Sequence, residues 1–224
     1  MPKTFVVSDL HLGSRFSRAG LFLDFLSGLP EGATLILNGD VVDHMCRVMP
    51  PVHAQVFDRL RAESLRRPVI WIRGNHDEEH QMDNPARIEF RTSYSLGRTL
   101  HAEHGSDFTS ESAIYRVFVR CFRAFHNFLI LLGAERVHVA FFAKNFPRLY
   151  EALRRHVRRK ATEYARRNGF GAVTCGHTHF AEATVLDGVH YFNTGSWTEE
   201  PVHYLEVDGT ACALKNYEPA RQTH

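Results

Sequence analysis

The sequence predicts an α/β protein in which two β-sheets pack face to face with helices outside, a two-sheet α/β sandwich. Two patterns lead to this class. In the first third of the chain, short continuous apolar runs alternate with amphipathic stretches, as in a buried parallel sheet. Near the end, short strand-like runs follow one another with Asp-Gly pairs between them, which is a hairpin signal. With 44% hydrophobic residues among 224, the chain can bury a sizeable core.

Three strand-then-helix units are expected at the N-terminal end. The strands cover residues 5–7, 34–37 and 69–72, and helices follow the first two at about residues 19–26 and 52–65. A short polar motif begins where each strand ends. Because ligands bind beyond the carboxyl ends of strands in open α/β sheets, these motifs are candidates for a functional site.

The later strands follow a different pattern. Residues 99–104 and 172–175 are expected to be strands that end in polar motifs. Beyond them we expect an antiparallel arrangement, because Asp187-Gly188 and Asp208-Gly209 separate short strand-like runs. These runs cover residues 183–186, 189–193, 202–207 and 211–217.

Residues 110–168 are predicted to form a helical insertion. Apolar side chains recur in its first half at an amphipathic helical spacing, at Phe118, Phe122, Phe125 and Leu129. A later helix is expected to start or bend at Pro147 and to end near Asn168-Gly169.

The insertion also differs in charge from the rest of the chain. Residues 111–168 hold 13 lysine and arginine residues against 4 aspartate and glutamate residues, whereas the whole chain has 27 against 25. The remainder is therefore acidic. Such an asymmetry suggests a polyanionic or membrane-surface partner for the insertion. We expect a single domain over residues 1–218 that carries this insertion, followed by a tail at residues 219–224.

The cysteines and the apolar runs bear on the cellular compartment. The four cysteines are widely spaced and form no CxxC pair, so reduced thiols are expected rather than disulfides. The N-terminus enters a strand directly and lacks the pattern of a secretory signal. The longest apolar run, residues 128–132, is far shorter than the roughly 20 residues of a spanning helix. We expect a cytoplasmic protein, either free or peripheral to the inner membrane.

Five short motifs follow the expected strands, and each contains residue types that bind metals. They are Asp9-Leu10-His11, Gly39-Asp40, Gly74-Asn75-His76-Asp77, His104-Gly105 and Gly176-His177-Thr178-His179. Any one of them alone is more often an ordinary turn or a surface pair. Together, their carboxylates, imidazoles and amide suit Mn, Fe, Zn or Co better than a pure oxygen site would. Two such ions about 3.5–4 Å apart can clamp an in-line displacement at phosphorus.

Spacing suggests how these side chains meet. Asp9 and His11 are two residues apart at a strand end, and side chains two apart in a strand share a face, so both can reach one ion. His177 and His179 have the same spacing. Asp40 directly follows Gly39, whose freedom to turn lets the carboxylate lie between two cations.

In this order, the five motifs resemble those of the calcineurin-like metallophosphoesterases, and the resemblance covers nearly the whole chain. It implies a four-layer α-β-β-α sandwich that hydrolyses phosphoesters with two divalent metal ions. By the same resemblance, one ion is held by Asp9, His11 and His179, the other by Asn75, His104 and His177, and Asp40 bridges them.

His76 is the candidate catalytic residue. It adjoins Asn75 and can face the leaving group as a general acid, with Asp77 available to orient it. A supporting hydrogen bond without a catalytic role is the alternative. Asp43 has two interpretations, a contact to substrate or metal shell and a helix N-cap. Residues 193–196, Asn-Thr-Gly-Ser, resemble a turn that packs beneath the metal site in this family, and a plain hairpin loop is the alternative.

A narrower resemblance is to the UDP-2,3-diacylglucosamine hydrolase branch of this family. The motifs that carry it are Ser8-Asp9-Leu10-His11-Leu12-Gly13, the helical insertion, and Gly188-Val189-His190-Tyr191-Phe192-Asn193. It implies hydrolysis of a pyrophosphate in lipid A synthesis, with release of UMP and an acyl-sugar phosphate, and manganese as the usual metal. The chain departs from that branch after His104-Gly105, where Ser106 replaces the usual acidic residue, and this puts the substrate in doubt.

The insertion leaves several partners open. Its aromatic and basic residues suit an acylated nucleotide-sugar substrate or an anionic membrane surface, with Phe118, Phe122 and Phe125 as substrate-binding candidates. Packing of these aromatics onto the core is the alternative. A phosphomonoesterase or phosphodiesterase of wider specificity, a nuclease that tracks a phosphate backbone, and a non-catalytic scaffold also remain, although nucleic acid is not the expected partner and the complete ligand set argues against the scaffold.

Overall fold

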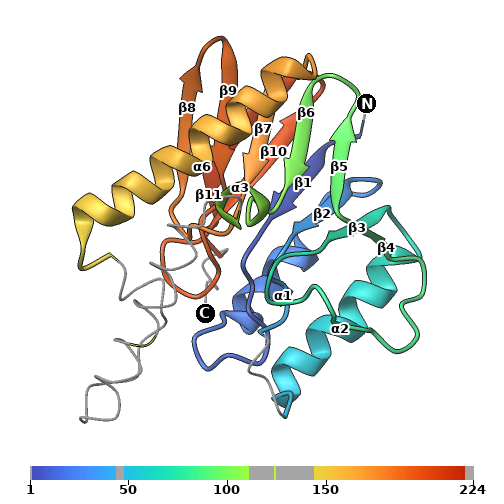
Figure 1. Cartoon of the computed structure of the whole chain (residues 1–224). Helices are drawn as coiled ribbons and strands as arrows, with labels where there is room; N and C mark the ends of the chain where they lie inside the picture. Colours follow the sequence, from blue (N-terminus) through green and yellow to red (C-terminus); the bar gives the residue numbers. More distant parts are fainter. Residues whose placement is uncertain (1, 44–47, 111–123, 125–143, 220–224) are drawn as a thin grey trace.

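The computed structural model describes residues 2–43, 48–110, 124 and 144–219 (Figure 1). Two β-sheets form its centre. The first has six strands in the order β11-β10-β1-β2-β3-β4. Its strands are β1 (Thr4–Val7), β2 (Thr34–Asn38), β3 (Val69–Ile72), β4 (Glu89–Arg91), β10 (His203–Asp208) and β11 (Ala211–Asn216). Strands β1 to β4 run parallel, and β10 joins β1 antiparallel.

The second sheet has five strands in the order β5-β6-β7-β9-β8. They are β5 (Ser93–Leu96), β6 (Leu100–Glu103), β7 (Ala172–Cys175), β8 (Glu182–Leu186) and β9 (Val189–Asn193). Strand β9 pairs antiparallel with β8 but parallel with β7. The predicted purely antiparallel C-terminal part is therefore wrong at β9, because the hairpin signal fixes the β8–β9 turn but not the partner on the other edge of β9.

Helices cover the outer faces of both sheets (Figure 1). Helices α1 (Ala19–Ser27) and α2 (Pro51–Ser64) pack on the six-stranded sheet, and their apolar side chains join one buried cluster with it. Helix α6 (Pro147–Arg167) lies across the five-stranded sheet and buries Val157, Ala161 and Ala165 against Val173 and Tyr191. A further buried cluster fills the space between the two sheets. This gives the four layers α-β-β-α and confirms the predicted sandwich.

Most predicted elements lie where the sequence placed them. Strands β4 and β5 were not predicted, since their residues are mostly half-buried or exposed and carry no apolar run. The Asp187-Gly188 turn has positive φ at both residues, 50° and 80°, as a tight β-hairpin turn requires. The predicted helix from Pro147 is confirmed, with Asn168 as its C-cap.

The insertion is described only in part. Short helix α3 (Asp107–Ser110) precedes it and α6 closes it. Phe118, Phe122 and Phe125 lie outside the described residues. The assignment of residues 1–218 to one domain with an insertion stays a prediction.

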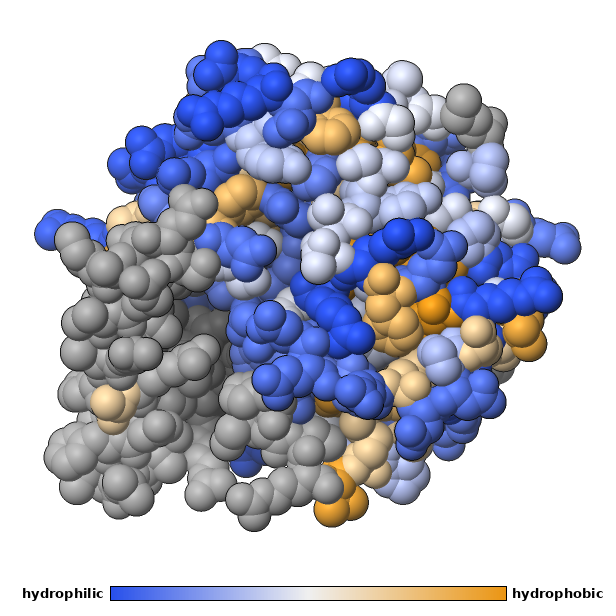
Figure 2. Space-filling model, turned by 45° about the vertical axis from the view of Figure 1, so that its right-hand side comes forward, coloured by the Kyte–Doolittle hydropathy of each residue, from blue (hydrophilic) through white to orange (hydrophobic). Residues whose placement is uncertain are grey.

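Among the described residues, no helix is both long and apolar enough to cross a membrane. On the face drawn in Figure 2, hydrophilic side chains cover most of the described surface, and hydrophobic ones form small separate areas. The described cysteines, Cys175 and Cys212, are free thiols.

Candidate metal centre

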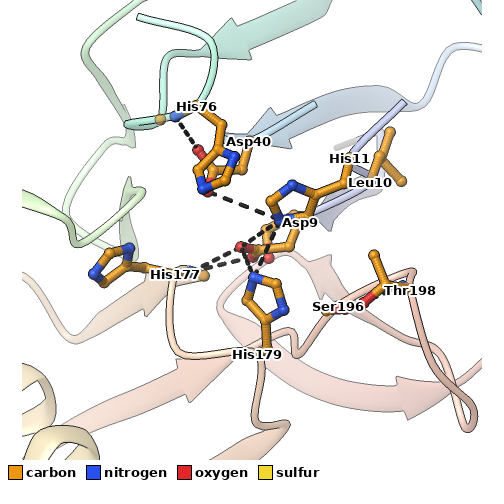
Figure 3. Close-up of polar contacts among 12 residues, drawn as sticks. Asp9, Leu10, His11, Asp40, His76, His177, His179, Ser196 and Thr198 are labelled. Atoms are coloured by element: carbon orange, nitrogen blue, oxygen red, sulfur yellow. Dashed lines mark hydrogen bonds and ion pairs between the residues drawn. The ribbon is translucent and has the colours of Figure 1, made fainter. Parts of the chain in front are cut away.

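The predicted ligands come from loops at one end of the sandwich, and both sheets contribute. The loops after β1, β2 and β3 supply Asp9 and His11, then Asp40, then Asn75 and His76. The loops after β6 and β7 supply the remaining histidines, His104, His177 and His179. Contacts cross between the sheets, since the backbone N–H of His177 donates to both carboxylate oxygens of Asp9 at 3.1 and 3.2 Å (Figure 3).

The side chains gather into groups whose possible ligand atoms all lie within 4.8 Å of one another. One group is Asp9, His11, Asp40 and His179, and a second is Asp40, His104 and His177. Asp40 belongs to both. Apart from Asn75, the two groups contain the residues of the two predicted ligand sets, and Asp40 is common to both.

The backbone at these residues is unusual. Asp9, His11, Asp40, His177 and His179 all have positive φ, between 48° and 64°. Non-glycine residues in this region carry strain that persists only when the surroundings fix it, and such residues cluster at functional sites. The prediction that each Asp/His or His/His pair shares the face of a strand is therefore wrong. Strand β1 ends at Val7 and β7 at Cys175, and left-handed loop residues place these side chains instead.

Three glycines let these loops close on the carboxylates. A Cβ atom on Gly74 would collide with the carboxylate and backbone of Asp40, and one on Gly176 would collide with the carboxylate of Asp9. A Cβ on Gly39 would collide with the ring of His104. The glycines of the motifs are thus explained by close approach around the site, as well as by the positive φ of Gly39, 85°.

The first group surrounds Asp9, which is completely buried. His179 Nε2 lies 3.1 Å from Asp9 Oδ1 and also 3.1 Å from His11 Nε2 (Figure 3). His11 Nε2 lies 3.9 Å from carboxylate oxygens of both Asp9 and Asp40. Two imidazole nitrogens and two carboxylates that converge in this way form a donor set suited to a divalent transition metal.

The second group surrounds Asp40. His104 Nδ1 donates to the carbonyl of Asn38 at 3.0 Å, which directs Nε2 towards Asp40 Oδ2, 3.2 Å away. A metal-binding histidine commonly donates its other ring nitrogen to a carbonyl in this way. Burial and the neighbouring His104 lower the pKa of His177 to about 3, so its ring is neutral at pH 7 and can bind a cation.

The buried carboxylate of Asp40 requires a positive charge beside it. Burial alone raises the pKa of Asp40, but His104, His76 and His11 outweigh it and hold that pKa well below its ordinary value. Burial lowers the pKa of His104, but the Asp40 carboxylate outweighs it and raises the pKa to about 10. In the form without a cation, a proton on His104 therefore balances Asp40. A cation that binds here takes the place of that proton, so the residues present fit a divalent metal site.

His76 lies beside the shared carboxylate, as the sequence suggests, but its partner differs from the predicted one. Its backbone N–H donates to Asp40 Oδ1 at 2.8 Å, and its Nε2 lies 4.0 Å from Asp40 Oδ2. Its Nδ1 lies 3.8 Å from a carboxylate oxygen of Asp43. His11, Asp43 and His76 also form a group within 4.8 Å. Asp43 does not cap α2, whose N-cap is Pro50.

The predicted role of Asp77 in orienting His76 needs correction. Its buried carboxylate accepts three hydrogen bonds, from Gly74 N at 2.6 Å, Val41 N at 2.8 Å and Trp71 Nε1 at 3.0 Å. These bonds use both oxygens and hold the loop that wraps over Asp40. Sequence reasoning paired Asp77 with His76 because they are adjacent, but the hydrogen bonds of the Asp77 carboxylate go to other residues.

Two further segments lie as support around the site. Asn193 Nδ2 donates to Gly176 O at 2.7 Å, Ser8 Oγ lies 2.7 Å from Thr194 Oγ1, and Trp197 N donates to Asp9 O at 3.0 Å. The turn at residues 193–196 therefore packs beneath the metal loops and is not a free hairpin loop. Thr109 Oγ1, which the sequence gave no reason to select, lies 3.3 Å from His177 Nε2. Asn75 is exposed.

Comparison with known proteins places the chain in context. A family model described as calcineurin-like phosphoesterase matches residues 2–181. UDP-2,3-diacylglucosamine hydrolases of Bordetella parapertussis and Bordetella bronchiseptica are each 32% identical over 131 residues, which is 50% of this chain and 49% of the relative. The aligned part thus spans about half the length of the curated relatives that the chain matches.

Solved structures resemble the chain at a lower sequence identity. A Vps29 single mutant from Entamoeba histolytica is 15% identical with a TM-score of 0.48, and the match covers 96% of this chain and 99% of that one. The E. coli phosphoesterase YfcE is 18% identical with a TM-score of 0.45, over 92% and 88% of the two chains. Likenesses at this level do not bear on function.

Proposed function

The chain belongs to the calcineurin-like phosphoesterase family, and from this premise we propose that it hydrolyses phosphoesters with two divalent metal ions. The observation that carries the proposal is the shared position of Asp40 between two groups of ligand atoms. Asp9, His11 and His179 would hold one ion, and Asn75, His104 and His177 the other. The proposed metal is manganese, and iron, zinc and cobalt suit the same donors.

When bound, two such ions neutralise charge on the phosphoryl oxygens and lower the pKa of a water molecule for attack at phosphorus. The chain's own residues then do three things. The buried carboxylates and imidazoles would hold the ions and, through them, fix the position of the phosphoryl group. His76, beside Asp40 and 15% exposed, carries a proton to the departing oxygen. Asp43, 3.8 Å from His76 Nδ1, would orient that ring.

As substrate we propose an acylated nucleotide sugar, with UDP-2,3-diacylglucosamine as the model compound. Two observations support this choice: the curated relatives bear that name, and the basic, aromatic insertion closes with α6, which lies beside the metal loops. Phe118, Phe122 and Phe125 would bind the acyl chains, and the arginines near them the phosphates or the headgroups of an anionic membrane surface.

A phosphomonoesterase or phosphodiesterase of wider specificity is the second candidate, and His76 favours it. A pyrophosphate leaves as a phosphate and needs little protonation, whereas an alkoxide needs an acid. The position of His76 next to Asp40 is thus of most use for ordinary esters.

An assay of the manganese-loaded protein decides between the two. We expect turnover of UDP-2,3-diacylglucosamine with release of UMP, at a kcat/KM at least about 100-fold above that for bis-p-nitrophenyl phosphate, because remote binding contributes only for the acylated substrate. Turnover of the model diester with none of the lipid substrate would support the second candidate. Full metal occupancy without turnover of either, or of nucleotides and oligonucleotides, would leave a non-catalytic scaffold.

A further inference from the structure

We infer that Tyr150 of α6 is a positioning residue that holds the loop with His177 and His179 in its metal-binding shape, and so couples the helical insertion to the metal centre. The inference rests on the proposed function, since it assigns a role at the same metal site. Tyr150 lies about 27 positions before His177 in the sequence, and none of the five motifs contains it.

The conformation of this loop has to be stabilised by residues outside it. His177 and His179 both have positive φ, 64° and 54°, and Thr178 lies between them. Thr178 N donates to Gly176 O at 2.6 Å, so the chain turns tightly here. Left-handed non-glycine residues are strained and persist only where the surrounding structure fixes them. Contacts that hold Thr178 in place therefore also fix the direction of the two imidazole rings on either side of it.

Two side chains form hydrogen bonds with Thr178, one from before it in the sequence and one from after it. The Tyr150 hydroxyl donates to the Thr178 carbonyl at 2.6 Å, in a buried hydrogen bond. Asn193 Nδ2 lies 3.1 Å from the Thr178 hydroxyl and donates to the carbonyl of Gly176. Asn193 belongs to the sheet beneath the site, whereas Tyr150 comes from α6. Burial raises the pKa of the Tyr150 hydroxyl, so it keeps the proton that it donates.

A second contact from α6 holds the next residue of the loop. The Arg154 guanidinium lies over the ring of Phe180, 3.3 Å from its centroid, and Phe180 directly follows His179. Arg154 is itself fixed by Glu151 at 2.9 Å and Glu182 at 2.8 Å. Tyr150 and Arg154 are one helical turn apart, so the same face of α6 holds the loop at two successive points.

These contacts connect α6, at the end of the insertion, to the loop that carries His177 and His179. Tyr150 lies in the first turn of α6, directly after the part of the insertion that precedes Pro147. A ligand that shifts this end of the helix would move the Thr178 carbonyl, and with it both histidines. The expected consequence is that loss of the Tyr150 hydroxyl weakens cation binding while the fold survives.

The test is Tyr150→Phe in the full-length protein, with Tyr164→Phe as the matched control. Both changes remove one phenol oxygen from α6. Among the described residues, however, the Tyr164 hydroxyl makes no hydrogen bond, and its ring packs on His101 and Phe108. After removal of metal with a chelator, Mn²⁺ is titrated and the free ion is measured by electron paramagnetic resonance. We expect the Mn²⁺ dissociation constant to rise about tenfold or more in Tyr150→Phe, as for other groups that orient metal ligands, and to stay unchanged in Tyr164→Phe.

Thermal melting of the metal-free proteins controls for folding. A structural role alone would lower the melting temperature of the metal-free form and leave the dissociation constant of the folded protein unchanged, which would overturn the inference. Arg154→Lys serves as a second variant, because it keeps the charge but loses the planar stack on Phe180, and a weaker affinity is expected there too. Absence of Mn²⁺ binding in the parent would instead contradict the proposed function. Equal affinity in the parent and both variants would contradict the role of α6 alone.

Discussion

At the scale of single residues, the site combines a strained backbone with buried charge. Five predicted ligand residues have a left-handed backbone conformation, and three glycines lie where a Cβ atom would collide with a carboxylate or with His104. The motifs could be found from the sequence because their residue types are rare in combination. The sequence could not show which neighbour each side chain meets, since that depends on loop conformation. Asp77 illustrates this, because its carboxylate accepts from two backbone N–H groups and the Trp71 indole rather than from the adjacent histidine.

The proposed role of His76 predicts a dependence on the leaving group. His76→Ala should lower kcat by about 10²–10⁴ for an alkyl phosphodiester, the usual contribution of a general acid. The loss should be much smaller for a p-nitrophenyl ester, whose leaving group hardly needs a proton. Steady-state kinetics with both esters and a measurement of bound metal give the comparison. Equal losses across leaving groups would show that His76 stabilises charge instead.

The position of Asp77 predicts a loss of stability with a different signature. Asp77→Asn keeps the shape but turns one acceptor oxygen into an NH₂ group, which then faces a backbone or indole N–H. We expect a decrease in unfolding free energy of about 1–3 kcal/mol, the cost of unsatisfied buried donors. Urea denaturation of the metal-free protein measures it. A variant as stable as the parent would mean that the three hydrogen bonds contribute little.

At the scale of elements, continuous apolar runs made β1, β2, β3 and β7 predictable, because buried parallel strands need no polar face. Strands β4 and β5 carry exposed polar residues and are recognisable only from their partners. The parallel pairing of β9 with β7 likewise depends on the tertiary arrangement. The Asp-Gly turn after β8 was predictable, since its backbone conformation selects that residue pair.

Helix α2 is tied to the loop that carries His11, and this contact predicts a pH dependence. The Gly13 N–H donates to His53 Nδ1 at 2.7 Å, and burial lowers the pKa of His53. Because the folded pKa lies below the unfolded value of about 6.5, the unfolded chain takes up a proton first as pH falls. The contribution of His53 is thus present above about pH 6.5 and lost as pH falls towards the folded pKa.

The matched variant for this effect is His53→Asn, whose amide oxygen can still accept from Gly13 but does not titrate. Urea denaturation between about pH 7.5 and pH 5 should show a smaller decrease in stability for the variant than for the parent. Parallel pH profiles for the two proteins would mean that His53 is equally protonated in the folded and unfolded states.

The insertion carries its own prediction, which concerns residues outside the described part of the chain. Replacement of Phe118, Phe122 and Phe125 by serine should raise KM for the acylated substrate and leave a small model diester almost unaffected, because these contacts would be remote from phosphorus. A pair of kcat/KM values checks this, with thermal melting as the folding control. Equal effects on both substrates, or none on either, would rule out an acyl-binding role.

At the scale of the whole molecule, the two sheets are brought together so that loops from both meet at one end. The six-stranded sheet supplies Asp9, His11 and Asp40, and the five-stranded sheet supplies His104, His177 and His179. The predicted sandwich with outer helices is confirmed, since each layer shares a buried apolar cluster with the next. The site therefore exists only when the inter-sheet core is formed, and metal binding should stabilise the fold as a whole.

The most direct test of the account is the number of metal ions per chain, measured by elemental analysis on the parent and on two variants. The parent should hold close to two transition metal ions, and Asp40→Ala should lose most of both, because both groups of ligands share that carboxylate. Asp43→Ala should keep both ions, since Asp43 lies beside His76 and outside those two groups. An unchanged metal content in Asp40→Ala would contradict the bridged centre.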